Sequence, residues 1–251
     1  MVLRANNPSR QGSSRDVTIG RLRAVYAKPP GDGPFAGVIV VHDALGLGQD
    51  MRGMVDQFTR AGYAAVAPDL YSDGARPLCV ARTLVDTVRS SGGQTADRIG
   101  AVRSWLADQP EVDEHRLGVI GYCMGGGFAL AAAVRLDFSV AAVNYGVVPA
   151  ETSQLAGVCP VVASYGDRDR MFAPNAARLQ THLQRLGVSH DIKVYPNVGH
   201  GFLSPTPPPR WTAPASPLLH VGYDEPAAGD AWQRIFSFFH ERLAREANKG
   251  S

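Results

Sequence analysis

The feature that most constrains this fold is an alternation of strand-like and helix-like segments, which runs without a break from about residue 17 to residue 246. Residues 37–42, GVIVVH, form a continuous apolar run, the pattern of a strand buried on both faces. Strands joined through helices of ten or more residues need right-handed crossovers, which give a mostly parallel sheet covered by helices on both faces. The sequence therefore predicts an α/β fold with one large core.

The same patterns predict where the elements lie. We expect strands near residues 17–19, 22–26, 37–42, 63–67, 116–122, 139–145, 160–165 and 191–195, and helices near 50–61, 96–108, 124–134, 173–186 and 226–247. In sheets of this kind the active site lies beyond the carboxyl ends of the strands. Functional residues are therefore expected in the loops that follow the strands.

Two segments depart from the alternation. Residues 1–16 are polar and cannot bury enough apolar area to offset the entropy of ordering, so we expect a flexible arm before a single domain over residues 17–247. Residues 204–219 carry six prolines, which predict an extended, stiff loop rather than a helix. That loop is either a surface connection or a rim or lid over the site. A third interpretation is a proline-rich segment that a partner domain binds.

Composition excludes several classes of partner. The net charge of +2 comes from 25 basic and 23 acidic residues scattered along the chain, so no basic stripe for nucleic acid is formed. No segment approaches the apolar length of a membrane span, and the first residues lack the apolar stretch of a secretory signal. Three cysteines without CxxC spacing fit a reduced compartment. We expect a cytoplasmic protein that is a monomer or a small homo-oligomer.

Residues 121–125, GYCMG, carry the chemistry. They match the nucleophile-elbow pattern G-x-S-x-G with cysteine in place of serine, between an apolar strand and a helix. Glycines are needed because the nucleophile occupies a strained turn where neighbouring side chains would collide. Cys123 also lies at a helix N-terminus, which favours a thiolate and an oxyanion. We interpret Cys123 as a nucleophile, against the alternative of a structural cysteine in a tight turn.

The partners of a nucleophile on this turn follow it in the order acid, then histidine, each after a strand. Asp167 and Asp169 follow the strand at 160–165, and His200 follows the strand at 191–195. We favour Asp169 because it lies further into its loop, while either aspartate could instead be a turn or cap residue. His200 would exchange protons with Cys123 and the leaving group, and the acid would orient its ring.

The loop after residues 37–41 is expected to supply a second backbone amide for an oxyanion, so His42, Asp43, Ala44 and Leu45 line the site. Asp43 could raise the pKa of the thiol by repulsion, accept its proton, or only cap the turn at residues 46–48.

Together the segments GYCMGG, APDLY, GDRDRMFAP, GHGF and AAGDAWQRIFSFF resemble the dienelactone hydrolase family over nearly the whole chain. The resemblance implies an α/β-hydrolase fold, no metal or organic cofactor, and hydrolysis of an enol-lactone or related ester. It implies a triad of Cys123, His200 and Asp169, with the amides of Met124 and Ala44 as oxyanion donors.

The sequence departs from the family at positions that bear on substrate. Where members that open dienelactone use a glutamate to handle the thiol proton, this chain has Asp43, one methylene shorter. The arginines that such members place after PDLY and after the histidine are also missing, although Arg76 and Arg210 lie nearby in the sequence and could take their place in the substrate pocket. Without an arginine clamp an anionic lactone loses charge-assisted hydrogen bonds, which shifts the expected preference toward neutral esters.

Aromatic residues fall at expected strand ends and in site loops, where they could line an apolar pocket or belong to the core. These are Tyr71, Tyr145, Phe172, Phe202 and Trp211.

The sequence thus predicts a hydrolase that cleaves a carboxylic ester or lactone through a cysteine acyl-enzyme. Three alternatives stay open. These are a generalist neutral carboxylesterase, a peptidase or acyltransferase on the same fold, and a non-catalytic binding or redox-sensing module with an oxidisable cysteine.

Overall fold

The computed structural model describes residues 14–75, 79, 93–207 and 216–244. Arg76, Arg210 and Trp211, which the sequence placed in the substrate pocket, lie outside these ranges, as does most of the expected N-terminal arm. No helix among the described residues combines the length and apolarity that a membrane span requires.

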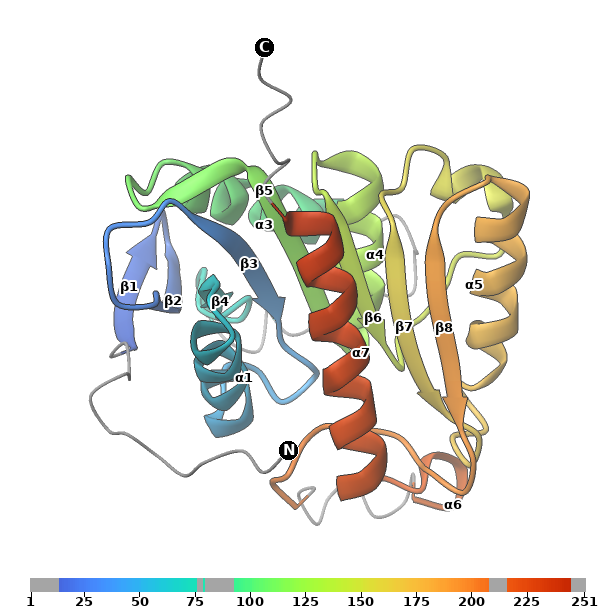
Figure 1. Ribbon diagram of the computed structural model, residues 1–251. Helices are drawn as coiled ribbons and strands as arrows, with labels where there is room; N and C mark the ends of the chain where they lie inside the picture. The colour runs from blue at the N-terminus through green and yellow to red at the C-terminus, as the bar shows by residue number, and fades with distance from the viewer. Residues whose placement is uncertain (1–13, 76–78, 80–92, 208–215, 245–251) are drawn as a thin grey trace, which may run out of the picture.

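The described strands form one eight-stranded sheet in the order β1-β2-β4-β3-β5-β6-β7-β8 (Figure 1). They are β1 (Arg15–Ile19), β2 (Leu22–Ala27), β3 (Phe35–Val41), β4 (Ala64–Pro68), β5 (Val112–Tyr122), β6 (Val140–Asn144), β7 (Val161–Gly166) and β8 (His190–Tyr195). The strands β3 to β8 run parallel, while β1 pairs antiparallel with β2 and β2 antiparallel with β4. The predicted mostly parallel sheet is confirmed.

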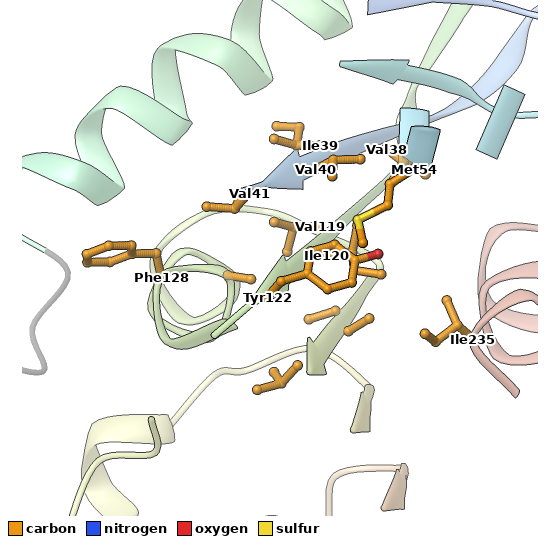
Figure 2. Close-up of a cluster of buried hydrophobic side chains, with 14 of the residues drawn as sticks. Val38, Ile39, Val40, Val41, Met54, Val119, Ile120, Tyr122, Phe128 and Ile235 are labelled. Carbon is orange, nitrogen blue, oxygen red and sulfur yellow. The ribbon is translucent and has the colours of Figure 1, made fainter. Parts of the chain in front are cut away.

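Helices cover both faces of the sheet. They are α1 (Gln49–Arg60), α3 (Gly93–Ala107), α4 (Met124–Arg135), α5 (Pro174–Arg185), α6 (Ser216–Leu219) and α7 (Glu225–Leu243), with a 3-10 turn η2 at Thr152–Leu155. Figure 1 shows α1 and α7 on the face toward the viewer and α3 and α4 behind the sheet. Figure 2 shows the resulting core, in which Val40 of β3 and Ile120 of β5 lie between Phe128 of α4 and Ile235 of α7.

The structure corrects three predicted boundaries. Arg15 and Asp16 belong to β1 rather than to a flexible arm, because their backbones pair with β2 while their charged side chains stay at the sheet edge. Asp16 forms an ion pair with Arg52 at 2.9 Å. The strand predicted to begin at residue 116 begins at Val112, and the last helix ends at Leu243 because the backbone of Ala244 is extended.

The proline-rich loop is not extended throughout, as we expected. Residues 216–219 form the short helix α6, and their backbone carbonyls accept hydrogen bonds from the loops after β7 and β8. The Arg170 amide donates to Leu218 at 2.9 Å, and the His200 amide donates to Leu219 at 2.7 Å. These bonds favour a compact turn over an extended chain.

Phe58 joins the two helices on one face of the sheet. It is fully buried in α1, and its ring lies 5.4–5.7 Å from the rings of Trp232, Phe236 and Phe239 in α7. We predict that Phe58→Ala lowers the free energy of unfolding by about 3–5 kcal/mol, because the substitution removes buried apolar atoms and leaves a cavity between α1 and α7. Chemical denaturation measures this change.

The matched control is Met171→Ala, since Met171 is an exposed apolar residue in a loop. It should change the free energy of unfolding by no more than about 0.5 kcal/mol. A loss below about 1 kcal/mol in Phe58→Ala would show that the aromatic cluster does not hold the two helices together.

Candidate active site

The site is built on the turn from β5 into α4, where Cys123 lies directly before the first helical residue. Its backbone is left-handed, with φ of 56°, a conformation that costs energy for a residue with a side chain. The Cys123 amide donates to the carbonyl of Asn144 at 3.0 Å, which ties the turn to β6. The turn therefore holds the thiol at the carboxyl end of the sheet, in a strained conformation typical of a nucleophile elbow.

Close backbone approach explains the glycines on both sides of the thiol. A Cβ atom on Gly121 would lie 1.9 Å from the carbonyl oxygen of Gly125, and one on Gly125 would lie 2.4 Å from the carbonyl oxygens of Val41 and His42. Both contacts are with backbone, so no side-chain movement relieves them. The glycine spacing predicted for an elbow is thus required by this packing.

An acid and a histidine meet beside the thiol. The Nδ1 atom of His200 donates to the Oδ2 atom of Asp169 at 2.6 Å, and both residues are buried, Asp169 with 0% exposure. The other carboxylate oxygen accepts from the amides of Met171 and Phe172 at 3.2 and 3.1 Å. These bonds fix the carboxylate, which in turn fixes the orientation of the ring.

The two candidate acids, Asp167 and Asp169, lie in different surroundings. Asp169 contacts His200, whereas Asp167 is exposed to solvent. The loop turns back after β7, and the Asp169 amide donates to Gly166 at 3.3 Å, which brings the second aspartate rather than the first toward the histidine loop. Asp169 is therefore the aspartate of this pair that contacts His200.

His200 is also affected by Cys123. Burial by itself lowers the pKa of His200, but the negative charge and the side chain of Cys123 and the hydrogen bond with Asp169 oppose it, so that the pKa is raised to about 10. Since Nδ1 is used by Asp169, the free nitrogen Nε2 serves the thiol. The three residues can hold an ion pair of imidazolium and thiolate.

The loop between β3 and α1 lies next to this group. Asp43 accepts the Leu45 amide at 2.8 Å, and the Asp43 carbonyl accepts from His42 Nδ1 at 2.6 Å. The Nε2 atom of His42 accepts the Leu70 amide at 3.0 Å, so the neutral ring carries its proton on Nδ1. His42 thus joins the loop that holds Ala44 to the loop after β4.

Tyr71 supports the same loop. Its hydroxyl donates to the carbonyl of Ala44 at 3.2 Å and lies 3.9 Å from the sulfur of Met124. The sequence interpreted Tyr71 as a pocket residue, and the structure places it between the two segments whose amides were predicted to bind an oxyanion. The amide of Met124 lies in the first turn of α4, where helix amides have no acceptor within the helix.

Burial changes the pKa of Asp43. It raises the pKa of the carboxyl, the Leu45 amide opposes this, the nearby charge of Asp50 raises it further, and His200 lowers it. The carboxyl is therefore easier to protonate than an exposed aspartate, which suits a group that could exchange a proton with a thiol.

The predicted aromatic residues differ in their positions. The ring of His200 contacts those of Tyr145 and Phe172, with its centroid 4.8 Å from each of theirs. Phe202 is fully buried and contacts Tyr145 and Tyr195, so it supports this group from behind.

Sequence analysis missed two contacts that close the site. The Gly222 amide donates to the His200 carbonyl at 3.1 Å, which adds a second bond between the segment after α6 and the histidine loop. Thr206 donates from its hydroxyl to Asp50 at 2.5 Å, which joins the residues after His200 to the first turn of α1. No local sequence signal indicates either contact, because the partners are far apart in the chain.

Among the described residues, no group of three or more His, Cys, Asp or Glu side chains is arranged to hold a metal ion.

A model of the Dienelactone hydrolase family matches residues 22–243, nearly the whole described chain. The chain belongs to the dienelactone hydrolase family. It is therefore a hydrolase of ester or lactone bonds, and the α/β-hydrolase fold that the sequence resemblance implied is confirmed.

Known proteins agree with this membership. The chain is 29% identical over 237 residues to a Salmonella typhimurium protein named "Putative carboxymethylenebutenolidase", with 87% of this chain and 82% of the relative covered. It is 28% identical over 205 residues to a Bradyrhizobium protein named "Probable 2-oxo-3-(5-oxofuran-2-ylidene)propanoate lactonase", with 74% and 81% covered. A solved Klebsiella pneumoniae structure described as a "Putative Dienelactone Hydrolase" is 25% identical, with a TM-score of 0.75 and 91% and 98% covered.

We predict that the ring of His200 is protonated at neutral pH, and that its pKa falls in Cys123→Ala because two of the causes that raise it are lost. A raised histidine pKa contributes stability that is fully present below the ordinary value of 6.5 and is lost as pH rises through about 10. NMR titration of the ring nitrogens measures both proteins.

Cys159→Ala is the matched control, since Cys159 is another partly buried cysteine and lies before β7. It should leave the His200 titration unchanged. The same titration in Cys123→Ala and the wild type would mean that the thiol does not interact with the ring.

Proposed function

We propose that the protein cleaves carboxylic esters or lactones through a thioester on Cys123, with His200 and Asp169 completing the catalytic triad. The observation that carries the proposal is the left-handed Cys123 at the start of α4, which acts electrostatically on a buried histidine that is itself fixed by a buried aspartate. Thiolate, proton carrier and orienting acid are the parts that acyl transfer by a cysteine requires.

In the first half of the reaction the Cys123 thiolate attacks the carbonyl carbon and forms the C–S bond, while the carbonyl electrons move to oxygen. The amides of Met124 and Ala44 would bind this oxyanion. When the intermediate collapses, the C–O bond of the ester breaks and Nε2 of His200 gives its proton to the leaving oxygen.

In the second half a water molecule gives a proton to His200 and attacks the thioester. The C–S bond then breaks, the carboxylic acid leaves, and the thiolate pairs again with the imidazolium. Asp169 stabilises the charged ring in both halves. Because a thiolate is itself a good leaving group, enol and aryl esters suit this site better than amides.

The charges around the site favour neutral substrates. Asp50 and His200 act on the carboxyl of Asp43, while Cys123 and Asp169 act on His200. Arg98, which donates to the Leu70 carbonyl, is already paired with Asp73 at 3.2 Å, and His200 is already paired with Asp169. An anionic lactone would therefore approach several carboxylates, and these two cations already have acidic partners. A neutral ester avoids this repulsion.

The first experiment compares hydrolysis of cis-dienelactone with that of a neutral aryl acetate, by the wild type and Cys123→Ala. We predict that kcat/KM of the variant falls by at least about 1,000-fold on any substrate that the wild type cleaves, because the nucleophile is removed. Absorbance at neutral pH follows both reactions. The wild type should prefer the acetate.

Cys159→Ala is again the control and should keep full activity. Full activity in Cys123→Ala would disprove the cysteine mechanism. A wild type that binds esters without cleaving them would instead support the non-catalytic binding or redox-sensing module.

We also propose that Asp43 steers the thiol proton. Asp43→Asn should lower kcat/KM about 10- to 100-fold, the range of a modest acid–base contribution. It should leave Tm at pH 7 unchanged or higher, because a raised pKa means that the ionised carboxylate disfavours the folded state. That gain should disappear as pH falls below 3.8, where the carboxyl is protonated even in the unfolded chain.

Asp56→Asn, a change of the same kind within α1, serves as the control and should alter neither quantity. Unchanged activity together with a lower Tm in Asp43→Asn would assign Asp43 to capping the turn through the Leu45 amide.

A further inference from the structure

Tyr145 has an unusual backbone for an aromatic residue. It follows the last residue of β6 directly, and its φ is 42°, in the left-handed region. The Tyr145 amide donates to the carbonyl of Ser164 at 2.8 Å, and the residue is only 1% exposed. Bulky residues keep such a strained backbone only where the surroundings enforce it, and these positions gather at functional sites.

The hydroxyl of Tyr145 is buried and has no hydrogen-bond partner among the described residues. Ser204 lies beside it and lowers its pKa, but the geometry of the pair does not make a hydrogen bond. By contrast, the buried hydroxyl of Tyr165 donates to Gly146 at 3.0 Å. A buried hydroxyl without a partner is costly, so its presence needs an explanation other than stability.

This hydroxyl belongs to the active site. The ring of Tyr145 packs on the ring of His200, and the charges of Asp43 and Cys123 both act on the hydroxyl. Burial is the main cause that holds its pKa well above the ordinary value, so the group keeps its proton and can donate it. It is therefore a neutral donor next to the nucleophile.

The segment from Ser204 to Thr206 lies at this end of the site, where Ser204 acts on the hydroxyl. It leaves the histidine loop on the β8 side and reaches α1 on the β3 side, so it crosses the ends of β5 and β6 that lie between them (Figure 1). Thr206 fixes its far end, with the hydroxyl 2.5 Å and the amide 3.4 Å from the two carboxylate oxygens of Asp50. Ser204 is held to Gly201 by a 2.9 Å backbone bond.

We propose that Tyr145 is a specificity-determining residue, whose hydroxyl donates a hydrogen bond to a second, uncharged acceptor oxygen of the substrate close to the scissile carbonyl. The inference rests on the proposed ester hydrolysis and names its substrate class. An ether, ketone or second ester oxygen satisfies the hydroxyl, whereas a carboxylate in that place would be repelled by Asp43. A substrate without such an oxygen leaves the donor unpaired.

The test uses two isosteric pairs of esters that differ by one oxygen in place of a methylene. On the acyl side these are 4-nitrophenyl methoxyacetate and butyrate, and on the leaving-group side 2-methoxyethyl acetate and butyl acetate. In Tyr145→Phe the preference for the oxygen-bearing member, as a ratio of kcat/KM values, should fall about 5- to 10-fold in at least one pair, the value of one neutral hydrogen bond. Taking the ratio within each enzyme removes the intrinsic reactivity of the esters.

Stability separates this role from a structural one. Tyr145→Phe removes a hydroxyl without a partner, so Tm should stay the same or rise. The control Tyr165→Phe removes a buried hydroxyl that has a partner, so its Tm should fall while both substrate ratios stay unchanged.

Two results would overturn the inference. Unchanged ratios in both pairs would show that the hydroxyl does not contact substrate, and a fall in Tm like that of Tyr165→Phe would show that it is satisfied inside the protein. If the wild type cleaves none of the four esters and neither cis-dienelactone nor the aryl acetate, the proposed function fails together with the inference. If Cys123-dependent hydrolysis is present but the ratios do not change, only the inference fails.

Discussion

The turn between β5 and α4 has no space for a side chain at Gly121 or Gly125, and the rest of the site depends on this close packing. Backbone atoms of β3 and α4 occupy the positions where Cβ atoms would lie. As a result the strand and the helix approach closely at the turn, where Cys123 is left-handed, at the edge where the loops after β3, β6, β7 and β8 begin. Cys123 is thus held by a tightly packed turn, whereas Asp169 and His200 come from loops.

The site combines two kinds of group that are costly to bury. The charged residues Asp169 and His200 are paired and hydrogen-bonded, which offsets their desolvation. Asp43 and Tyr145 are less well satisfied, because burial disfavours the carboxylate of the first and the hydroxyl of the second has no partner. This division fits an active site, in which some groups hold the geometry and others await a substrate.

Much of the molecule could be predicted from the sequence. Apolar runs such as residues 37–42 predict buried parallel strands, and the GYCMG pattern predicts the elbow, because both depend on local physical requirements. The order of acid and then histidine along the chain, each after a strand, also identified Asp169 and His200 as candidate site residues. Boundaries were less accurate, since the pairing of Arg15 and Asp16 with β2 depends on the sheet rather than on their own polarity.

Contacts between distant loops could not be predicted. The unpartnered hydroxyl of Tyr145, the bond between Thr206 and Asp50, and the turn at α6 all depend on how segments far apart in the chain pack in space. The hydrogen bonds from the amides of Arg170 and His200 to the carbonyls of residues 218 and 219 outweighed the preference of the proline-rich sequence for an extended backbone.

The bonds that join residues 218–222 to the loops of Asp169 and His200 have a consequence for synthesis of the protein. The ribosome makes the cysteine at position 123 long before it makes His200, and Gly222, which fixes the His200 loop from the other side, comes later still. The loop of His200 therefore gains its last contacts only after residues 218–222 have been made, well after Cys123. Cys123 and His200 come together late in the synthesis of this domain, because the contacts that hold the histidine loop come from both sides of it in the sequence.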